Sequence, residues 1–416
     1  MSILLKNLQL FDSNKVVDIA VERGEISKIG KNLDLPKAKT HDFKGLLVSP
    51  GWVDLFADFG DPGYEEREGL PSGARLAAAS GFTDICLIPN LNPTSDTKSS
   101  IRYIMNGARE SIASIHPIGA VSDNCEGESM AELFDLYHAG AVYFSDGLKP
   151  IKSTELLLKA LQYTQRFGGL VATNPVDLDL AKHGQMHEGV TSTSWGLGGI
   201  PRVSEIIGIK RDLEVLRYGG GRLHFSGISC LESVQLIAEA KKEGLQVTCD
   251  VPVLNLIFTA TGMPPFSTAY KVTPPLREES DRQRLLTGLK DDVIDAISCR
   301  HLPRTAEEKD LEFDLAEFGA STLQTSFSVL QKLSKEVSFS KLVEKVTDGP
   351  RKILGLAPVK IAEGSEAKLS FFDPQKQWEL NAQTNLSKSK NNPMMGQQLE
   401  GCAMGIVNGE RYHFLG

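Results

Sequence analysis

The stretch LVSPGWVDLFADFGDPG, residues 47–63, decides the fold of this chain. An apolar run leads into a break at Pro50 and Gly51, a second apolar run follows, and another break closes it at Pro62 and Gly63. A short apolar run bounded by such breaks is typical of a buried strand. Comparable runs recur downstream, so we expect this stretch to begin a series of core strands.

Eight such runs, each followed by a helix-like segment, fill about 300 residues. This pattern predicts an α/β fold with a (β/α)8 barrel, also called a TIM barrel. An open doubly wound sheet is the alternative, because periodicity does not count closure. The runs are Leu46–Leu55, Phe82–Pro89, His116–Val121, Ala141–Phe144, Leu170–Thr173, Arg222–Ile228, Leu245–Val251 and Val293–Cys299.

Both ends of the chain have β character instead. Residues 1–48 and 359–416 contain alternating or apolar runs, and Asn408-Gly409 is a hairpin signal. Neither piece can bury a face alone, so we expect the two to pair as a small discontinuous β-sandwich domain beside a barrel at 49–358. Between the last strands, the polar residues 381–392 predict a mobile loop.

Composition excludes several classes of partner. The 416 residues include 45 basic and 53 acidic side chains, for a net charge of −8, so we expect neither nucleic acid nor a membrane surface as partner. No apolar run approaches the roughly 18 residues of a membrane span, and the N-terminus does not resemble a signal peptide. The six cysteines form no CxxC pair, which indicates reduced thiols and a cytoplasmic location.

In a barrel, function lies where the strands end and the following loops begin. The residues at these places are therefore the candidates for a site. They are Phe56, Asp58, Asn90, Asp146, Gly147, Asn174, Gly227, Asn255, Arg300 and His301.

Several motifs make the chain resemble the dihydroorotases of the bacterial, barrel-type class, which are cyclic amidohydrolases, over nearly its whole length. The motifs together are specific, and each alone is weak. They are PGWVD at 50–54, GFT at 81–83, PNLNP at 89–93, FSDG at 144–147, HEG at 187–189, LGGIP at 197–201, VTCDV at 247–251, PPLR at 274–277 and ILGL at 353–356.

The resemblance implies metal-dependent hydrolysis in pyrimidine biosynthesis. In this family one or two ions, usually zinc, generate hydroxide from a bound water and polarise the scissile amide. An aspartate at the end of the last strand then carries the proton. The resemblance also implies histidine and carboxylate ligands that converge from several strand ends.

The matching positions in this chain are largely substituted. A zinc ion needs three or more protein ligands, and only Asp58 remains as one, while Arg300 stands at the family's catalytic aspartate and would repel a cation. We therefore expect no metal and no other cofactor, with zinc only if the family-type activity survives. The six positions are Phe56, Asp58, Gly147, Asn174, Gly227 and Arg300.

The family's substrate-binding positions are also changed, to Gly60, Thr273 and Arg304, although Asn90 is retained. Arg300 and Arg304 could hold an anion, or Arg300 could pair with Asp58 or Asp146; we favour the pair, because buried charges need partners. The candidate ligand-binding residues are Asn90, Arg300, Arg304, Asp58, Asp146 and His301.

Two other patterns have a simpler interpretation than a site. His183 and His187 have the i, i+4 spacing of a metal pair, but their polar, glycine-containing surroundings favour two loop histidines. Cys299 lies beside Arg300 within an apolar strand, which favours a packed core thiol over a nucleophile.

Three functions remain open at this point. The leading hypothesis is a dihydroorotase-like protein that has lost hydrolysis and serves as a structural partner, which the resemblance suggests to be one of aspartate transcarbamoylase. The alternative is an active dihydroorotase or other cyclic amidohydrolase with a rearranged site built from Asp58, Asp146, Arg300 and His301. A sensor of a small anion such as carbamoyl aspartate is the third. We also expect a homo-oligomer.

Overall fold

A closed ring of parallel strands forms the centre of the protein, in a computed structural model that describes residues 2–13 and 15–415. One sheet has the order β6-β7-β8 and a second the order β14-β13-β12-β9. Parallel bridges from Phe144 to Gly119 and Val171, and from Ala57 to His301, join the two sheets into a ring of eight segments. The structure is thus a (β/α)8 barrel, and the open-sheet alternative is wrong. The ring strands are β6 (Trp52–Ala57), β7 (Phe82–Leu87), β8 (Ser114–Pro117), β9 (Val171–Thr173), β12 (Leu223–Phe225), β13 (Val247–Pro252) and β14 (Ala296–Ser298).

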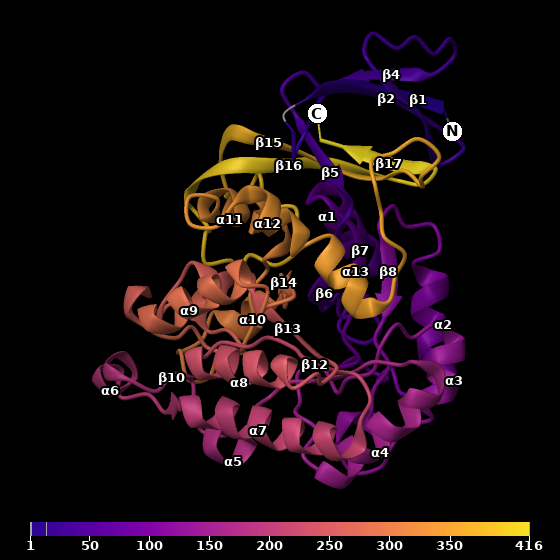
Figure 1. The fold of residues 1–416 in the computed structure, drawn as a ribbon. Helices are drawn as coiled ribbons and strands as arrows, with labels where there is room; N and C mark the ends of the chain where they lie inside the picture. The colour runs from indigo at the N-terminus through magenta and orange to yellow at the C-terminus, as the bar shows by residue number, and fades with distance from the viewer. Residues whose placement is uncertain (1, 14, 416) are drawn as a thin grey trace.

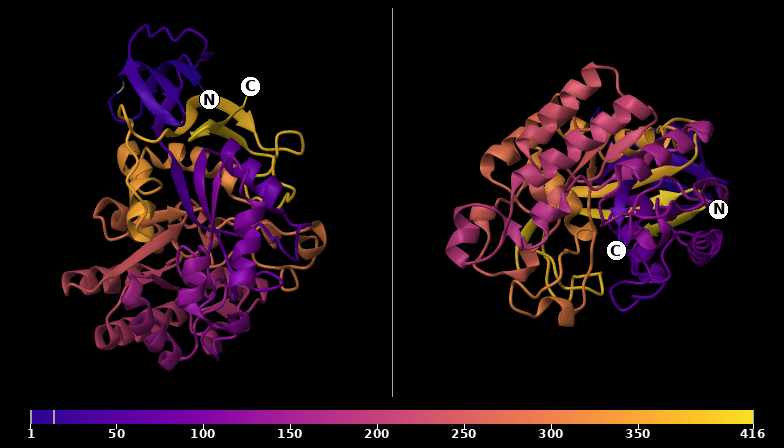
Figure 2. Two further views of the ribbon diagram at one scale, coloured as in Figure 1. Left: turned by 90° about the vertical axis from the view of Figure 1, so that its right-hand side faces the viewer. Right: turned by 90° about the horizontal axis from the view of Figure 1, so that it is seen from below.

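Helices cover the outside of this ring, as the views in Figures 1 and 2 show. Two of these helices begin at a capping side chain. Thr97 Oγ1 accepts a hydrogen bond from the backbone N–H of Ser100 at the start of α2, and Ser153 Oγ accepts one from the backbone N–H of Leu156 at the start of α4. The main helices are α1 (Leu70–Ala79), α2 (Lys98–Gly107), α3 (Leu133–Ala139), α4 (Thr154–Thr164), α7 (Arg202–Gly219), α8 (Leu231–Lys242), α9 (Glu279–Lys290) and α11 (Ser326–Leu333).

Shorter elements lie in the loops between these. They are α5 (Leu178–Ala181), α6 (Val190–Trp195), α10 (Ala306–Lys309), α12 (Phe339–Glu344) and α13 (Asp348–Leu354), with the strand pair β10 (Met186–His187) and β11 (Gly199–Ile200).

Gly51 divides the first apolar run between two sheets. The break that the sequence predicts at Pro50 and Gly51 is confirmed, since β5 (Leu47–Pro50) belongs to the terminal sheet and β6 to the barrel. A Cβ on Gly51 would lie 2.3 Å from Thr83 Oγ1, so only glycine lets the chain pass close to β7 at this point. The apolar run at 46–55 therefore spans parts of two strands.

The two ends of the chain pair in one curled sheet with the order β17-β16-β15-β5-β1-β2-β3, and β4 pairs with β1. Figure 1 shows its strands as two layers, β1, β2 and β4 above β15, β16 and β17. Buried side chains from both ends, including Leu5, Phe371 and Val407, form one core between them. The strands are β1 (Ser2–Leu10), β2 (Val16–Glu22), β3 (Glu25–Gly30), β4 (Lys39–Asp42), β15 (Lys368–Glu379), β16 (Gln398–Asn408) and β17 (Arg411–Phe414).

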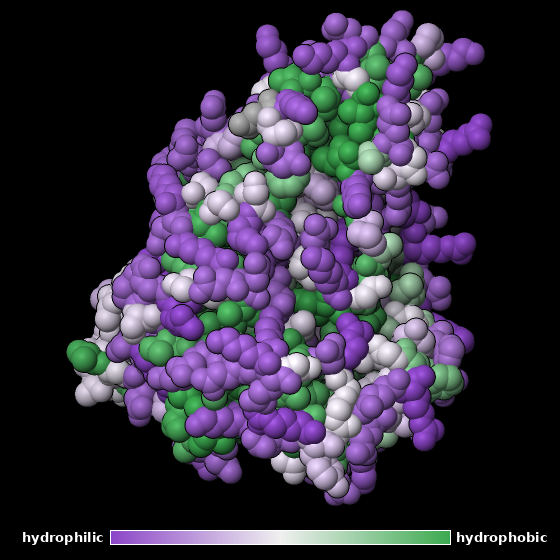
Figure 3. Space-filling view, viewed as in Figure 1, coloured by the Kyte–Doolittle hydropathy of each residue, from purple (hydrophilic) through white to green (hydrophobic). Residues whose placement is uncertain are grey.

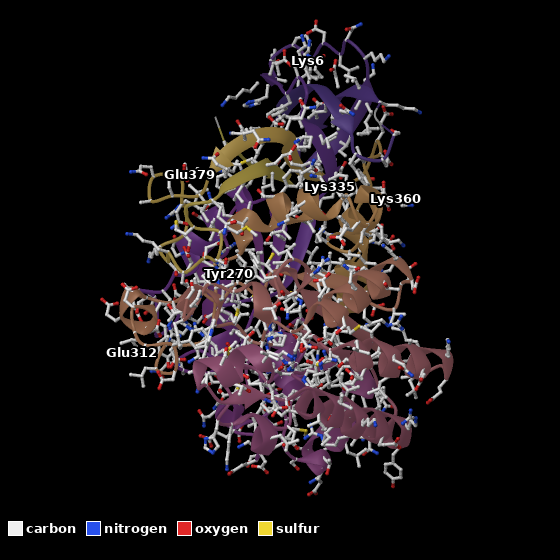
Figure 4. The ribbon with its side chains drawn as sticks, turned by 90° about the vertical axis from the view of Figure 1, so that its left-hand side faces the viewer. Lys6, Tyr270, Glu312, Lys335, Lys360 and Glu379 are labelled. Carbon is white, nitrogen blue, oxygen red and sulfur yellow. The ribbon has the colours of Figure 1, made fainter. Side chains whose placement is uncertain are left out.

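The polar segment 381–397 packs against the barrel loops. Asn391 Nδ2 donates to the carbonyl oxygen of Gly319 at 2.9 Å, and Ser389 Oγ donates to that of Arg304 at 2.7 Å. The hydroxyl of Tyr270, labelled in Figure 4, donates to the carbonyl oxygen of Pro393 at 3.1 Å. Ser387, Ser389, Asn391 and Asn392 are buried and hydrogen-bonded, whereas residues 382–384 are exposed. The expectation of a mobile loop is therefore wrong for the part of the segment from 387 to 392.

The surface in Figure 3 is covered largely by hydrophilic side chains, with smaller hydrophobic areas between them. In the part of the chain that the structure describes, every helix is too short or too polar to traverse a bilayer.

Candidate functional site

The carboxyl ends of the barrel strands carry the residues that the resemblance places at the centre of the family's site. Phe56 lies near the end of β6, Asn174 follows β9, Gly227 lies two residues after β12, and Arg300 lies two residues after β14. The structure brings Phe56, Gly227 and Arg300 together. Asn174 instead donates from Nδ2 to the carbonyl oxygen of Leu148 at 3.1 Å.

Arg300 occupies the space between these strand ends. Its Cζ lies 4.1 Å from the centroid of the Phe56 ring. Nε donates to the carbonyl oxygen of Thr273 at 2.9 Å, and Nη1 donates to Ser226 Oγ at 3.2 Å. A Cβ on Gly227 would lie 2.3 Å from Nη1, so the guanidinium fills the place of any side chain at that position. With Arg300 only 4% exposed, this is a packed cation.

The expected pairing of Arg300 with Asp58 or Asp146 is wrong. Among the described residues, Arg300 makes no ion pair within 4 Å, and its Nη2 is buried without a hydrogen bond. Asp58 pairs with Arg304 instead, and Asp146 accepts bonds from the backbone N–H groups of Val121 and Ser122. The physical reason is that Arg300 turns toward the Phe56 face, where the cation interacts with the ring rather than with a carboxylate.

Buried carboxyl groups inside the barrel balance this cation at longer range. Burial lowers the pKa of Arg300, while the charge of Asp250 acts to raise it. Asp250 is itself fixed by His224, whose Nε2 lies 2.9 Å from Oδ2. Burial raises the pKa of Asp54 to about 7, and its Oδ2 has no hydrogen bond. The charge of Arg300 is therefore balanced by several buried carboxyl groups at longer range and not by one ion pair.

Asp58 is held by groups on three sides. Its Oδ1 accepts from the backbone N–H of Gly60 at 2.8 Å, and its Oδ2 lies 3.2 Å from Nη1 of Arg304 and 4.0 Å from Nη1 of Arg67. Arg67 also binds Glu308. The only family-type ligand left in this chain is thus already neutralised by arginines.

Asn90 closes a loop and is not free to bind a ligand. Its Oδ1 accepts from the backbone N–H of Leu148 at 2.8 Å, and its Nδ2 donates to the carbonyl oxygen of Asp146 at 3.1 Å. Gly147 has a φ of +61°, and a Cβ there would lie 2.0 Å from Asn90 Oδ1. The amide of Asn90 thus fills the position where a side chain at 147 would begin.

His301 is buried beside Glu68. Its Nδ1 accepts from the backbone N–H of Thr322 at 3.1 Å, which places the ring proton on Nε2, 3.9 Å from Glu68 Oε2. Burial lowers the pKa of His301 to about 3 and raises that of Glu68. Glu68 in turn accepts from the hydroxyls of Ser72 and Ser387. His301 is therefore a neutral, buried ring that accepts a backbone hydrogen bond at Nδ1, while its Nε2 has no hydrogen-bond partner among the described residues.

A cavity of about 230 Å³ opens beside Gly227 and Asn174, between the ends of β9 and β12. Its wall is mostly apolar, with the buried residues Glu205 and Arg277 and the exposed Lys182 as its charged groups. Arg277 donates to the carbonyl oxygen of Ile200 at 2.8 Å, and its Nη2 lies 3.6 Å from Glu205 Oε2. This volume suits a small molecule, although the two buried charges that line it, Glu205 and Arg277, compensate each other.

Arg277, which lines this cavity, also contacts a histidine for which the sequence predicts only a loop position. His187 lies outside any helix, in the short strand β10. Its Nδ1, however, lies 3.2 Å from Nη1 of Arg277, and burial followed by the charge of Arg277 lowers its pKa to about 4. The sequence held one indication of this contact, because His187 begins the motif HEG and Arg277 ends the motif PPLR, and both motifs belong to the family resemblance. The expectation for Cys299 is confirmed: its thiol is buried, 3.0 Å from Ser326 Oγ, and its pKa is raised.

These residues do not fit a zinc ion held as the resemblance implies. The six positions supply one carboxylate, which arginines occupy, together with a phenylalanine, two glycines, an amide and a cation. The cavity that Arg300 lines measures about 10 Å³, room for about one water molecule. A separate group of Cys230, Glu232 and Asp281 lies within 4.8 Å at the start of α8, but Arg202 already binds Asp281 at 2.7 Å.

Comparisons with known proteins agree with the resemblance. A family model described as dihydro-orotase-like matches residues 45–233. A dihydroorotase of Trichlorobacter lovleyi is 37% identical over 424 residues, covering 100% of both chains. A dihydroorotase of Geotalea daltonii is 36% identical over 422 residues, covering 99% of both.

Solved structures of other proteins have a fold similar to that of this chain. An L-hydantoinase (dihydropyrimidinase) from Arthrobacter aurescens superposes with a TM-score of 0.87 at 23% identity, covering 100% of this chain and 97% of that one. A dihydropyrimidinase from Brevibacillus agri gives a TM-score of 0.85 at 21% identity, covering 99% and 95%. At these identities the match concerns the fold alone. The full-length relatives decide the assignment, and the chain belongs to the dihydroorotase family.

Proposed function

We propose that this protein is a dihydroorotase-family member that has lost zinc-dependent hydrolysis and serves as a structural partner in pyrimidine biosynthesis, with aspartate transcarbamoylase as the candidate partner. The observation that carries this proposal is the packing of Arg300 against Phe56 and Gly227. A permanent cation in this place opposes a divalent ion, because like charges repel strongly in a site with little water.

The retained frame supports a role that depends on shape. The ring of eight strand segments closes, and both chain ends pair in one sheet, although the chemistry at the strand ends has changed. A surface on such a frame can serve assembly without any metal at the barrel mouth. The partnership itself rests on analogy with the family, as does the expectation of a homo-oligomer.

The second candidate is an active dihydroorotase, or another cyclic amidohydrolase, that interconverts dihydroorotate and carbamoyl aspartate through a rearranged site. The names of relatives 36–37% identical over nearly their whole length favour it. The four residues suggested for such a site are engaged separately: Asp58 with Arg304, Asp146 with Ser122, His301 with Thr322, and Arg300 with Phe56. An active enzyme would therefore use another set of groups.

One experiment separates the two candidates. The protein is purified without chelators, its metal content is measured, and dihydroorotate ring opening and closure are assayed with and without added zinc. Our proposal predicts no stoichiometric metal, turnover at background, and co-elution with aspartate transcarbamoylase in gel filtration. Stoichiometric zinc together with turnover well above background would overturn it. Light scattering on the same sample gives the oligomeric state.

If turnover is found, two variants locate it. In a site built from the four suggested residues, Asp58→Asn and His301→Gln would each abolish turnover. Lys335→Ala, at an exposed position, is the matched control and leaves turnover unchanged.

A further inference from the structure

A third cavity, of about 350 Å³, lies where three segments distant in the sequence meet. Its wall comes from the loop after β6 at 66–67, from residues 304–310 after β14, and from residues 388–391 of the 381–397 segment. Thr268 and Ala269, next to the Tyr270 labelled in Figure 4, complete it. Its size is within the range of small-molecule sites, and it is too small for a folded partner.

Positive charge dominates the wall of this cavity. Two carboxylates, Glu66 and Asp310, also line it, and both are exposed. Behind the wall, Asp58 and Glu308 pair with the two arginines. The five cationic side chains of the wall are Arg67, Arg304, Lys309, Lys388 and Lys390.

The three lysines have no such ion pair. Among the described residues, none of them has a carboxylate partner within 4 Å, although Glu308 and Glu317 interact with Lys309, and Glu65 and Glu68 with Lys388, at longer range. Lys309 Nζ donates to the carbonyl oxygens of Glu317 at 2.8 Å and Gly319 at 3.2 Å. Lys388 Nζ donates to the carbonyl oxygen of Glu65 at 2.9 Å, and Lys390 lies exposed at the rim. The ammonium groups of Lys309 and Lys388 are therefore hydrogen-bonded to backbone carbonyl oxygens but not paired with a carboxylate.

Lys309 makes this arrangement unusual, because its side chain is only 5% exposed. A buried ammonium group without a counter-ion is unfavourable. Burial, and then the charges of Arg304 and Lys271, lower the pKa of Lys309 to about 7, against the smaller opposing effect of the carboxylates Glu317 and Glu308. An anion in the cavity would relieve both effects.

We propose that this cavity binds a small polyanion carrying at least two acidic groups, carboxylates or phosphates. Two groups are required because the cationic residues come from separate segments of the wall, Arg304 and Lys309 on the barrel loop and Lys388 and Lys390 on the 381–397 segment. Arg304 presents its Nη2 without a hydrogen bond in the described structure, since Nε and Nη1 hold Phe318, Pro303 and Asp58. Arg300 lines a different cavity. The inference does not depend on whether the barrel catalyses a reaction.

The test is a titration of the full-length protein with pyrophosphate, citrate and sulfate, followed by calorimetry and by thermal unfolding at constant ionic strength. We expect saturable binding of pyrophosphate or citrate at submillimolar concentration, weaker binding of sulfate, and a higher melting temperature. Binding of only one of the two polyanions identifies the acidic group as phosphate or carboxylate.

Two surface variants tie the binding to this cavity. Lys388→Ala with Lys390→Ala should weaken binding about tenfold or more, because two charge-assisted contacts are lost. Both positions are exposed, so the fold is retained, which an unchanged melting temperature without ligand verifies. Lys335→Ala, at an exposed position outside the cavity and set apart from Tyr270 in Figure 4, should bind as the unaltered protein does.

Two outcomes would overturn the inference. One is the absence of saturation by either polyanion up to about 10 mM, a concentration at which even a weak site fills. The other is an equal loss of affinity in the Lys335→Ala protein, which would indicate binding to the surface charge as a whole.

Discussion

The guanidinium of Arg300 stacks over the ring of Phe56, with its Cζ 4.1 Å from the ring centroid. These residues are 244 positions apart in the chain, at the ends of the strands that close the barrel, β14 and β6. Where the family resemblance implies a metal and its ligands, this chain has a cation and an aromatic face. The substitutions at 56 and 300 are therefore matched to each other, which is the basis of the first two predictions.

A double-mutant cycle with Phe56→Leu and Arg300→Met should give a coupling energy of about 1–2 kcal/mol, the range for a cation and ring shielded from water. Each single change removes the contact, so the double change should cost less than the sum of the two. Chemical denaturation of the four proteins measures it. A coupling near zero would show that the stacking contributes nothing to stability.

Gly227→Ala should destabilise the protein more than Gly168→Ala. Both glycines have positive φ, +75° and +68°, so both changes cost about 1–2 kcal/mol in backbone strain. Only at Gly227 would the new Cβ meet Arg300, at 2.3 Å from Nη1, which adds about 1–3 kcal/mol. Denaturant midpoints compare the two. The added cost should disappear when Arg300 is also changed to Met, and its persistence would contradict the steric explanation.

His301→Gln should reduce the loss of stability at acidic pH. The pKa of His301 is lowered to about 3, whereas histidine in an unfolded chain titrates near 6.5. Between these values the unfolded state binds a proton that the folded state does not, so the contribution of His301 falls as the pH falls below 6.5. Between pH 7.5 and 5 the difference amounts to about 2 kcal/mol.

Unfolding free energies of the two proteins at both pH values check this. Asp54, whose pKa is raised to about 7, acts with the opposite sign, but it is present in both proteins and cancels in the comparison. Parallel pH profiles for the two proteins would disprove the assignment.

Asn391→Ala should destabilise the packing of the 381–397 segment by about 1–3 kcal/mol, the cost of leaving buried partners unsatisfied. The change removes the bond to the carbonyl oxygen of Gly319 and the bond accepted from the N–H of Arg304. Limited proteolysis should then cleave this segment faster. The exposed Gln383→Ala serves as control and should stay within about 0.5 kcal/mol of the unaltered protein. Equal cleavage of both variants would refute the role of Asn391.

Much of the barrel could be predicted from sequence because its strands and helices carry local patterns. Seven of the eight expected runs overlap a barrel strand, while the eighth, Ala141–Phe144, contributes only the bridges of Phe144. The break at Pro50 and Gly51 is visible in the sequence, but the close approach of Gly51 to the side chain of Thr83, 32 residues away, is set only by the tertiary structure.

The candidate site was predictable in its residues but not in its contacts. Residue types at 56, 147, 174, 227 and 300 are enough to say that histidine and carboxylate ligands are missing there. The residue types do not reveal the partner of each charge. Arg300 and Arg304 are near in sequence yet contact different residues, Phe56 and Asp58.

The sequence by itself determined the alternation of strands and helices, the resemblance to the family and the loss of the family's ligands, since periodicity and residue type are properties of the chain. The closure of the strands into a ring was decided by the tertiary structure. Only the tertiary structure decided that Arg300 stacks on Phe56 above Gly227, that Arg304 takes Asp58, and that Lys309 is buried in a basic cavity with the 381–397 segment. The physical reason is that charge pairing and burial depend on distances between strand ends and loops, which residues hundreds of positions apart set together.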